Sequence, residues 1–191
     1  MKTIDNFNFA GKKALIRVDF NVPLDENFKV TDNTRIEAAK PTIEKILKDG
    51  GTAVLMSHLG RPKGERNDKY SLRHIVSEVE KVLGKKVIFV DDCVGEVAEK
   101  AVAAAPAGSV VLLENLRYHN EEEKGDENFS KQLAKLGDIY VNDAFGTAHR
   151  AHASTTIVAK FFPNNKCFGY LLAKEIESID KVMRTGEKPV T

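Results

Sequence analysis

The stretch KALIRVDF, residues 13–20, decides the fold class, because it is a largely continuous apolar run where a surface strand would alternate polar and apolar residues. Strands of this composition are covered on both faces, as in a parallel sheet. Similar runs recur along the chain, at 52–58, 86–90, 110–116, 138–145 and 166–172. The sequence therefore predicts six strands, several of them covered on both faces.

Helical patterns separate these runs. Thr34 and Glu37 have the spacing of a capping box ahead of an amphipathic segment, and Pro41 inside that segment predicts a kink or two abutting short helices. Further helices are predicted at 72–83, 94–104 and 126–136. Because parallel neighbours need crossovers of about this length, we expect a Rossmann-like, three-layer α/β domain with a mostly parallel six-stranded sheet flanked by helices.

Composition limits the possible partners. The 191 residues suit one large domain, and 29 Lys and Arg against 28 Asp and Glu give a net charge of +1, which disfavours nucleic-acid or membrane binding. No apolar run approaches the length of a membrane span, and the N-terminus has no hydrophobic signal core, so we expect a cytoplasmic protein. Cys93 and Cys167 form no paired motif and are predicted to be small buried residues.

Charged and polar side chains follow four of the predicted strands. In open parallel sheets the loops beyond the carboxyl ends of the strands bind ligands, so these side chains should share one edge. Arginine pairs well with phosphate and carboxylate oxygens, and a nearby carboxylate can accept a hydrogen bond from a substrate hydroxyl. The ligand inferred is a small phosphorylated hydroxy acid. The strand-end residues are Asp19, Asn21, Arg35, His58, Arg61, Lys63, Arg117 and Arg150.

The stretch AFGTAHRAHAST, residues 144–155, allows two interpretations. His149 and His152 could share a helical face and bind a metal, or they could support an anion site around Arg150. No accompanying ligand pattern of a hydrolytic metal centre is present, so no metal site is expected. His119 and the acidic run 121–123 are interpreted as solvent-facing.

Neither a GxxxxGK[ST] phosphate loop nor a GxGxxG motif after a strand occurs in the sequence, so no nucleotide site is visible. Four blocks nevertheless resemble the signature blocks of the phosphoglycerate kinases, in that family's order. They are RVDFNVPL (17–24), SHLGRPKG (57–64), LLENLRYH (112–119) and NDAFGTAHRAHAS (142–154). The resemblance covers nearly the whole chain.

The resemblance implies a domain organisation and an activity. It implies that residues 1–172 are an N-terminal domain for 3-phosphoglycerate or 1,3-bisphosphoglycerate, and that 173–191 are the hinge-leading helix and the start of an absent C-terminal domain. That second domain would bind Mg-ATP or Mg-ADP. The enzyme would transfer a phosphoryl group reversibly between 1,3-bisphosphoglycerate and ADP, and this half is expected to be monomeric and inactive alone.

The resemblance also implies roles for single residues. Arg35 would approach the transferring phosphoryl group as the catalytic residue, and His149 and His152 would support the basic patch. The substrate-binding residues implied are Asp19, Asn21, Arg35, His58, Leu59, Gly60, Arg61, Arg117 and Arg150.

Two other interpretations stay open from the residues alone. The chain could be a stand-alone module that binds phosphate or organic acids without an enzymatic partner. It could also be a metal hydrolase using His149, His152 and Asp143.

Overall fold

The computed structural model describes residues 2–144 and 151–186, with side chains described as far as Lys181. Its six strands form one sheet in the order β3-β4-β2-β1-β5-β6, and every strand pair is parallel. The predicted α/β class and six-stranded sheet are confirmed, although the edge strands β3 and β6 each have an exposed residue. The strands are β1 (Lys13–Arg17), β2 (Thr52–Met56), β3 (Val87–Val90), β4 (Val110–Leu113), β5 (Ile139–Asn142) and β6 (Lys166–Phe168).

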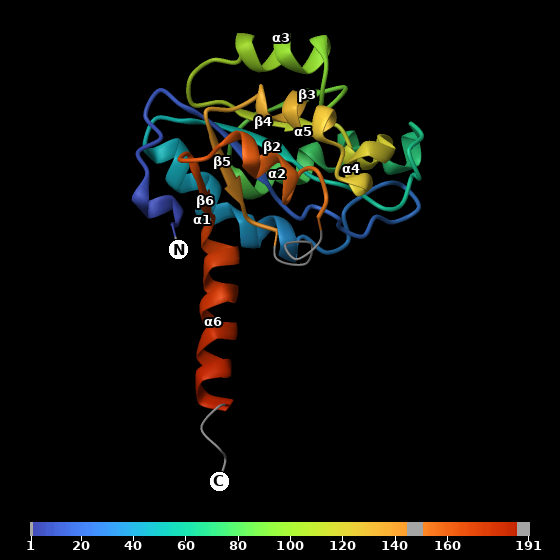
Figure 1. Ribbon diagram of the computed structural model, residues 1–191. Coiled ribbons are helices and arrows are strands. Elements are labelled where there is room, and N and C mark those ends of the chain that lie inside the picture. The colour runs from blue at the N-terminus through green and yellow to red at the C-terminus, as the bar shows by residue number, and fades with distance from the viewer. Residues whose placement is uncertain (1, 145–150, 187–191) are drawn as a thin grey trace.

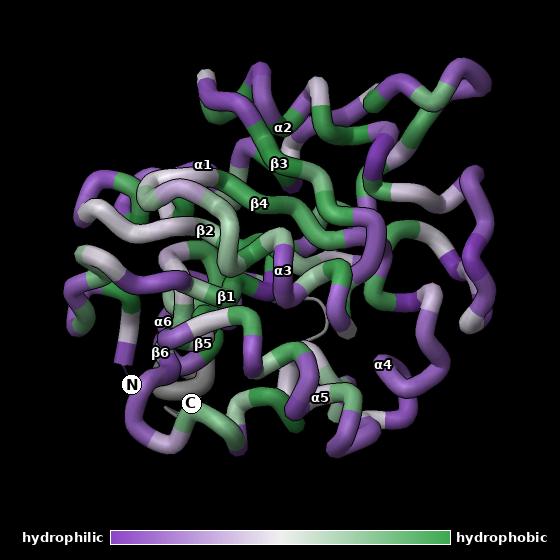
Figure 2. The backbone as a smooth tube through the Cα atoms, turned by 90° about the horizontal axis from the view of Figure 1, so that it is seen from above, coloured by the Kyte–Doolittle hydropathy of each residue, from purple (hydrophilic) through white to green (hydrophobic). Residues whose placement is uncertain are grey.

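Helices cover both faces of the sheet (Figure 1). One core lies between the sheet and α1 and α2, and the other lies between the opposite face and α3 and α5. Strand β4 is continuously hydrophobic in Figure 2, and every residue of β2 and β4 is buried, which explains why these sequences do not alternate. The α-helices are α1 (Thr34–Lys48), α2 (Val76–Leu83), α3 (Glu96–Ala104), α4 (Asn120–Lys124), α5 (Glu127–Ala134) and α6 (Tyr170–Gly186).

Helix α1 differs from its prediction. It is one continuous helix that includes Pro41, so the alternative of two short helices is wrong. The predicted capping box at Thr34 is also wrong: Asn33 precedes the helix without a side-chain cap, and the Thr34 N–H donates to Asp32 Oδ1 at 2.9 Å. Burial of the apolar face of α1 against the sheet stabilises the helix despite the missing proline N–H.

The last apolar run, 166–172, is divided between two elements. Strand β6 ends at Phe168, and α6 begins at Tyr170 and projects away from the sheet (Figure 1). Asp143 at the end of β5 holds its first turn, since the Leu172 N–H donates to Asp143 Oδ1 at 3.1 Å. A Cβ on Gly169 would lie 2.3 Å from Asp143 Cγ, so this close approach requires glycine.

No helix in the described parts of the chain is both long and apolar enough to cross a membrane. The division at residue 172 stays a prediction.

Candidate functional site

The loops that follow β1 and β5 leave the sheet toward opposite faces. After β1 the chain enters α1 on one face, whereas after β5 it reaches the 3₁₀ helix η6, Ile157–Phe161, whose Val158 belongs to the core on the other face. In open α/β sheets, ligands bind at the crevice where such loops diverge. The topology thus directs attention to the carboxyl ends of β1 and β5.

Three of the predicted residues meet in the loop after β1. Arg35, from the first turn of α1, donates to the Asn21 carbonyl at 2.8 Å and lies 3.2 Å from Asp19 Oδ1. The Arg35 side chain remains 53% exposed, so its guanidinium faces solvent as well as these partners. This arrangement places a cation and a carboxylate side by side at the edge of the crevice.

Asn21 connects this loop to the turn after β2. Its Oδ1 accepts the Gly60 N–H at 2.8 Å, while the neighbouring Leu59 carbonyl accepts from Asn115 Nδ2 at 2.7 Å. Gly60 has φ +61°, and a Cβ there would lie 2.3 Å from Tyr70 Cδ1, so only glycine fits. The turns after β1, β2 and β4 are thereby held together, as the strand-end argument predicted. Arg61, which follows, is exposed.

Arg117 lies in the 3₁₀ helix η4, Leu116–Tyr118, which follows β4. The Asn115 side chain fixes the start of this helix by accepting the Arg117 N–H at 3.0 Å. Among the described residues, the buried Arg117 Nε and the buried His152 Nδ1 have no hydrogen-bond partner. Buried polar atoms without a partner are unfavourable, and ligand binding is one way to satisfy them.

Arg17, at the end of β1, is fully buried and was missed in the sequence analysis. Its guanidinium donates to His58 Nδ1 at 3.0 Å, to Ser154 Oγ at 2.8 Å and to the Val18 carbonyl. Ser154 in turn donates to Glu122 Oε2 at 2.5 Å. The signal that could have found Arg17 was an arginine inside an otherwise apolar buried run, because a buried guanidinium needs partners.

Glu122 departs from the interpretation of the acidic run 121–123 as solvated, whereas Glu121 and Glu123 are exposed as expected. Its side chain is fully buried and accepts from both the backbone N–H and the hydroxyl of Ser154. The carboxylate therefore compensates the buried charge of Arg17 through Ser154.

Arg17 also determines the proton position on His58. A guanidinium only donates hydrogen bonds, so Nδ1 must accept and the proton of the neutral ring sits on Nε2. Burial, reinforced by the charges of Arg17 and Arg117, lowers the pKa of His58 to about 2. Burial likewise lowers the pKa of His152. His58 thus supplies a neutral N–H donor to the site rather than a positive charge.

The structure describes some of the remaining predicted residues but not others. His149 and Arg150 lie outside the described residues. The interpretation of His119 as solvent-facing is wrong, because its side chain is only 28% exposed and Nε2 bonds to Asp92 Oδ1 at 2.9 Å. Cys93 and Cys167 are free and buried, as expected.

Together, the described residues form a cationic edge built from separate loops. Guanidinium groups, a neutral imidazole N–H and a carboxylate with an adjacent amide would bind an anionic ligand that also carries a hydroxyl group. The elements that bring these residues together are β1, β2, β4 and the start of α1.

Comparison with known proteins agrees with this arrangement. The family model described as phosphoglycerate kinase matches residues 4–191. The chain is 49% identical to phosphoglycerate kinase of Porphyromonas gingivalis, covering 99% of this chain and 51% of that protein. It is 53% identical to that of Moorella thermoacetica, covering 98% and 47% respectively. The chain therefore spans about half the length of the curated relatives it matches.

Solved structures give the same result. The phosphoglycerate kinase of Coxiella burnetii superposes with a TM-score of 0.83 at 36% identity, covering 94% of this chain and 44% of that one. The enzyme of Pyrococcus horikoshii superposes with a TM-score of 0.86 at 31% identity, covering 100% and 47%. The chain belongs to the phosphoglycerate kinase family and corresponds to the N-terminal domain of its members.

Proposed function

We propose that this chain is the substrate-binding half of a phosphoglycerate kinase and binds 3-phosphoglycerate or 1,3-bisphosphoglycerate. The observation that carries the proposal is the convergence of the turns after β1, β2 and β4 on one sheet edge, with the buried Arg117 Nε unpartnered among the described residues. Three phosphate oxygens and a carboxylate would provide the acceptors that such an edge lacks.

The two ends of the substrate would meet different residues. Arg61, Arg117, His58 Nε2–H and, by family resemblance, Arg150 would hold the phosphate that is not transferred. Asp19 and Asn21 would bind the hydroxyl and the acyl end. His149 and His152 would support the positive potential.

Arg35 would be the catalytic residue of this half. Its guanidinium already lies beside Asp19 and the Asn21 carbonyl, and its exposed part faces the solvent into which a transferring phosphoryl group would project. Phosphoryl transfer needs mainly positioning and neutralisation of charge, so the contribution of Arg35 would be electrostatic. Mg-ATP or Mg-ADP would be bound by a C-terminal domain of the family, and this half alone would not turn over.

Calorimetric titration with 3-phosphoglycerate tests the proposal. Arg117→Ala should weaken binding about ten- to a hundredfold, since it removes charge-assisted hydrogen bonds. Arg73→Ala, an exposed arginine paired with Asp68, is the matched control and should leave binding unchanged. Equal affinity for 3-phosphoglycerate in the unmodified chain, Arg117→Ala and Arg73→Ala would overturn the site assignment.

A second arm separates the enzyme half from a stand-alone anion-binding module. The phosphoglycerate kinase proposal requires 3-phosphoglycerate to bind more tightly than inorganic phosphate or citrate. Indistinguishable affinities would favour the module. A coupled ATP assay on the same material should show negligible turnover, and substantial turnover would contradict the need for the second domain.

A further inference from the structure

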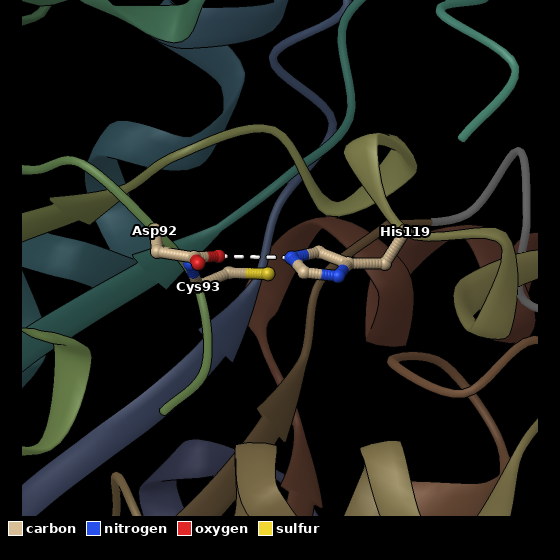
Figure 3. A group of neighbouring side chains, drawn as sticks. All are labelled: Asp92, Cys93 and His119. Atoms are coloured by element: carbon tan, nitrogen blue, oxygen red, sulfur yellow. Dashed lines mark hydrogen bonds and ion pairs between the residues drawn. The ribbon is translucent and has the colours of Figure 1, made fainter. Parts of the chain in front are cut away.

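Asp92, Cys93 and His119 form a cluster of three potential metal ligands at the same sheet edge (Figure 3). Asp92 and Cys93 lie in the turn between β3 and α3, and His119 follows η4. One ligand atom from each residue lies within 4.8 Å of the others, and His119 Nε2 is 2.9 Å from Asp92 Oδ1. The 25 residues between Cys93 and His119 explain why the sequence shows no metal motif.

The three groups suit zinc. Thiolate, imidazole and carboxylate are the ligands that Zn²⁺ takes, and zinc sites of the catalytic type have three protein ligands and leave the fourth position to water or substrate. Zinc bond lengths of about 2.0–2.3 Å place neighbouring tetrahedral ligands about 3.3–3.7 Å apart. To surround an ion, His119 Nε2 and Asp92 Oδ1 would move apart from 2.9 Å, and the other separations, all within 4.8 Å, would shorten by at most about 1.5 Å.

The surroundings hold the ligands in place. The Asp92 carboxylate accepts the Cys93 N–H at 2.7 Å, and the His119 ring packs against Phe129 with centroids 5.2 Å apart. Cys93 is fully buried, whereas the Asp92 and His119 side chains are 33% and 28% exposed, so an ion can approach from their side. A cavity of about 360 Å³ adjoins His119, and its lining includes Glu121, Asp126 and Asn128.

We propose that Asp92, Cys93 and His119 bind one Zn²⁺ ion, with a water molecule as the fourth ligand. On binding, the Cys93 thiol loses its proton to solvent as the sulfur–zinc bond forms. The proton that His119 Nε2 shares with the Asp92 carboxylate leaves Nε2 for Nδ1 as the nitrogen–zinc bond forms. One proton is thus released per ion, and no oxidant or reductant is needed.

The ion would link two turns that support the candidate site. His119 is two residues beyond Arg117, so fixing it to the turn after β3 would restrain η4. Zinc should therefore raise the thermal stability of the chain. The proposal is independent of the substrate assignment, because none of the three ligands belongs to the proposed phosphoglycerate contacts.

Calorimetry and absorption spectroscopy with Co²⁺ test the proposed site. Both use the protein after bound metal has been removed with a chelator. Zn²⁺ should bind with a stoichiometry of one, and titrations in buffers of different ionisation enthalpy should report one proton released. Co²⁺ should give a thiolate-to-cobalt absorption band in the unmodified chain. Absence of zinc binding, or binding of Co²⁺ without that band, would overturn the proposal whatever the variants do.

Variants locate the ligands. His119→Gln and Cys93→Ser should each weaken zinc binding more than about a hundredfold, because a direct ligand is lost. Cys167→Ser and His74→Gln change the other buried cysteine and another partly buried histidine, and should leave affinity unchanged. Circular dichroism checks that each variant is folded. Equal zinc affinity in folded His119→Gln and in the unmodified chain would refute the site.

Discussion

At the carboxyl ends of the strands, Arg17, His58 and Glu122 are buried, whereas at the amino ends of the neighbouring strands β1 and β5 the charged Lys13 and Asp138 reach solvent. Both ends use hydrogen bonds to connect strands: the Lys13 N–H donates to Asp138 Oδ2 at 2.8 Å, much as Asn21 receives the Gly60 N–H. Among the described residues, only the carboxyl end removes ionisable groups from water, which is unfavourable unless they are paired. The sheet does not need buried charges to be stable, because its amino end has none in the described parts of the chain. The buried charges at the carboxyl end therefore need another explanation.

Cavity size does not distinguish the two ends. A cavity of about 760 Å³ lies at the amino end, larger than the other cavities described, but its lining carries balanced charges. Opposite charges cancel for an approaching anion, while the carboxyl edge concentrates arginines. The charged residues lining the amino-end cavity are Lys13, Lys100, Lys135, Glu96, Glu99 and Asp138.

The largest expected effect is on the free energy of unfolding. It compares the loss of a charged side chain at the carboxyl end of β1 with the loss of one at its amino end. Arg17→Met should lower the free energy of unfolding by about 3–5 kcal/mol, because it leaves Glu122 buried without its compensating cation. Lys13→Met, at the amino end of β1, should change it by less than about 0.5 kcal/mol. Urea denaturation of both variants measures the difference. Similar losses in the two would mean that the buried charges are not coupled.

A smaller, pH-dependent effect is expected at Asp143. Burial raises the pKa of Asp143 to about 6, so the folded protein retains a proton that the unfolded chain has lost. Stability should therefore fall as pH rises from about 4 to 6 and stay lower above that, by about 3 kcal/mol from this residue. Asp143→Asn should remove the dependence and be the more stable protein at pH 8. Thermal melts across this range would contradict the assignment if the two profiles were parallel.

His58 should make stability depend on pH in the opposite sense to Asp143, so that its contribution falls as pH is lowered. Because its pKa is lowered to about 2 in the folded state, only the unfolded chain takes up this proton as pH falls below about 6.5. Stability should drop by about 1.4 kcal/mol per pH unit from this residue, or about 2 kcal/mol at pH 5.

His58→Asn keeps an acceptor for Arg17 and should lose this acid sensitivity. The same melts, compared with those of His74→Asn, isolate the contribution. An unchanged acid profile in His58→Asn would show that folding does not lower the pKa of His58.

Much of the fold could be predicted because burial on two faces leaves a direct mark on sequence. Continuous apolar runs such as residues 52–56 and 110–113 have no other ready interpretation in a chain of this composition. The errors came where tertiary packing overrides local signals. Pro41 breaks an isolated helix, but the packed face of α1 keeps it whole.

The candidate site was predictable only in part. Residues that follow strands, such as Asp19, Asn21 and His58, could be placed at one edge from topology alone. Glu122 could not, because a carboxylate in the run 121–123 has the pattern of a solvated segment, and its burial depends on Ser154 from a distant loop. Side-chain networks that join separate segments leave no periodic signal in the sequence.

Helix α6 extends far from the sheet but is attached to the end of β5. It is 17 residues long, which corresponds to about 25 Å, and its first turn is held by Asp143, directly after β5. A tilt of about 10° at that turn would move the far end of the helix by about 4 Å. A small change in the position of the end of β5 would thus cause a larger displacement at the far end of α6. Conversely, a force on the far end of α6 would act on the hydrogen bond between Leu172 and Asp143.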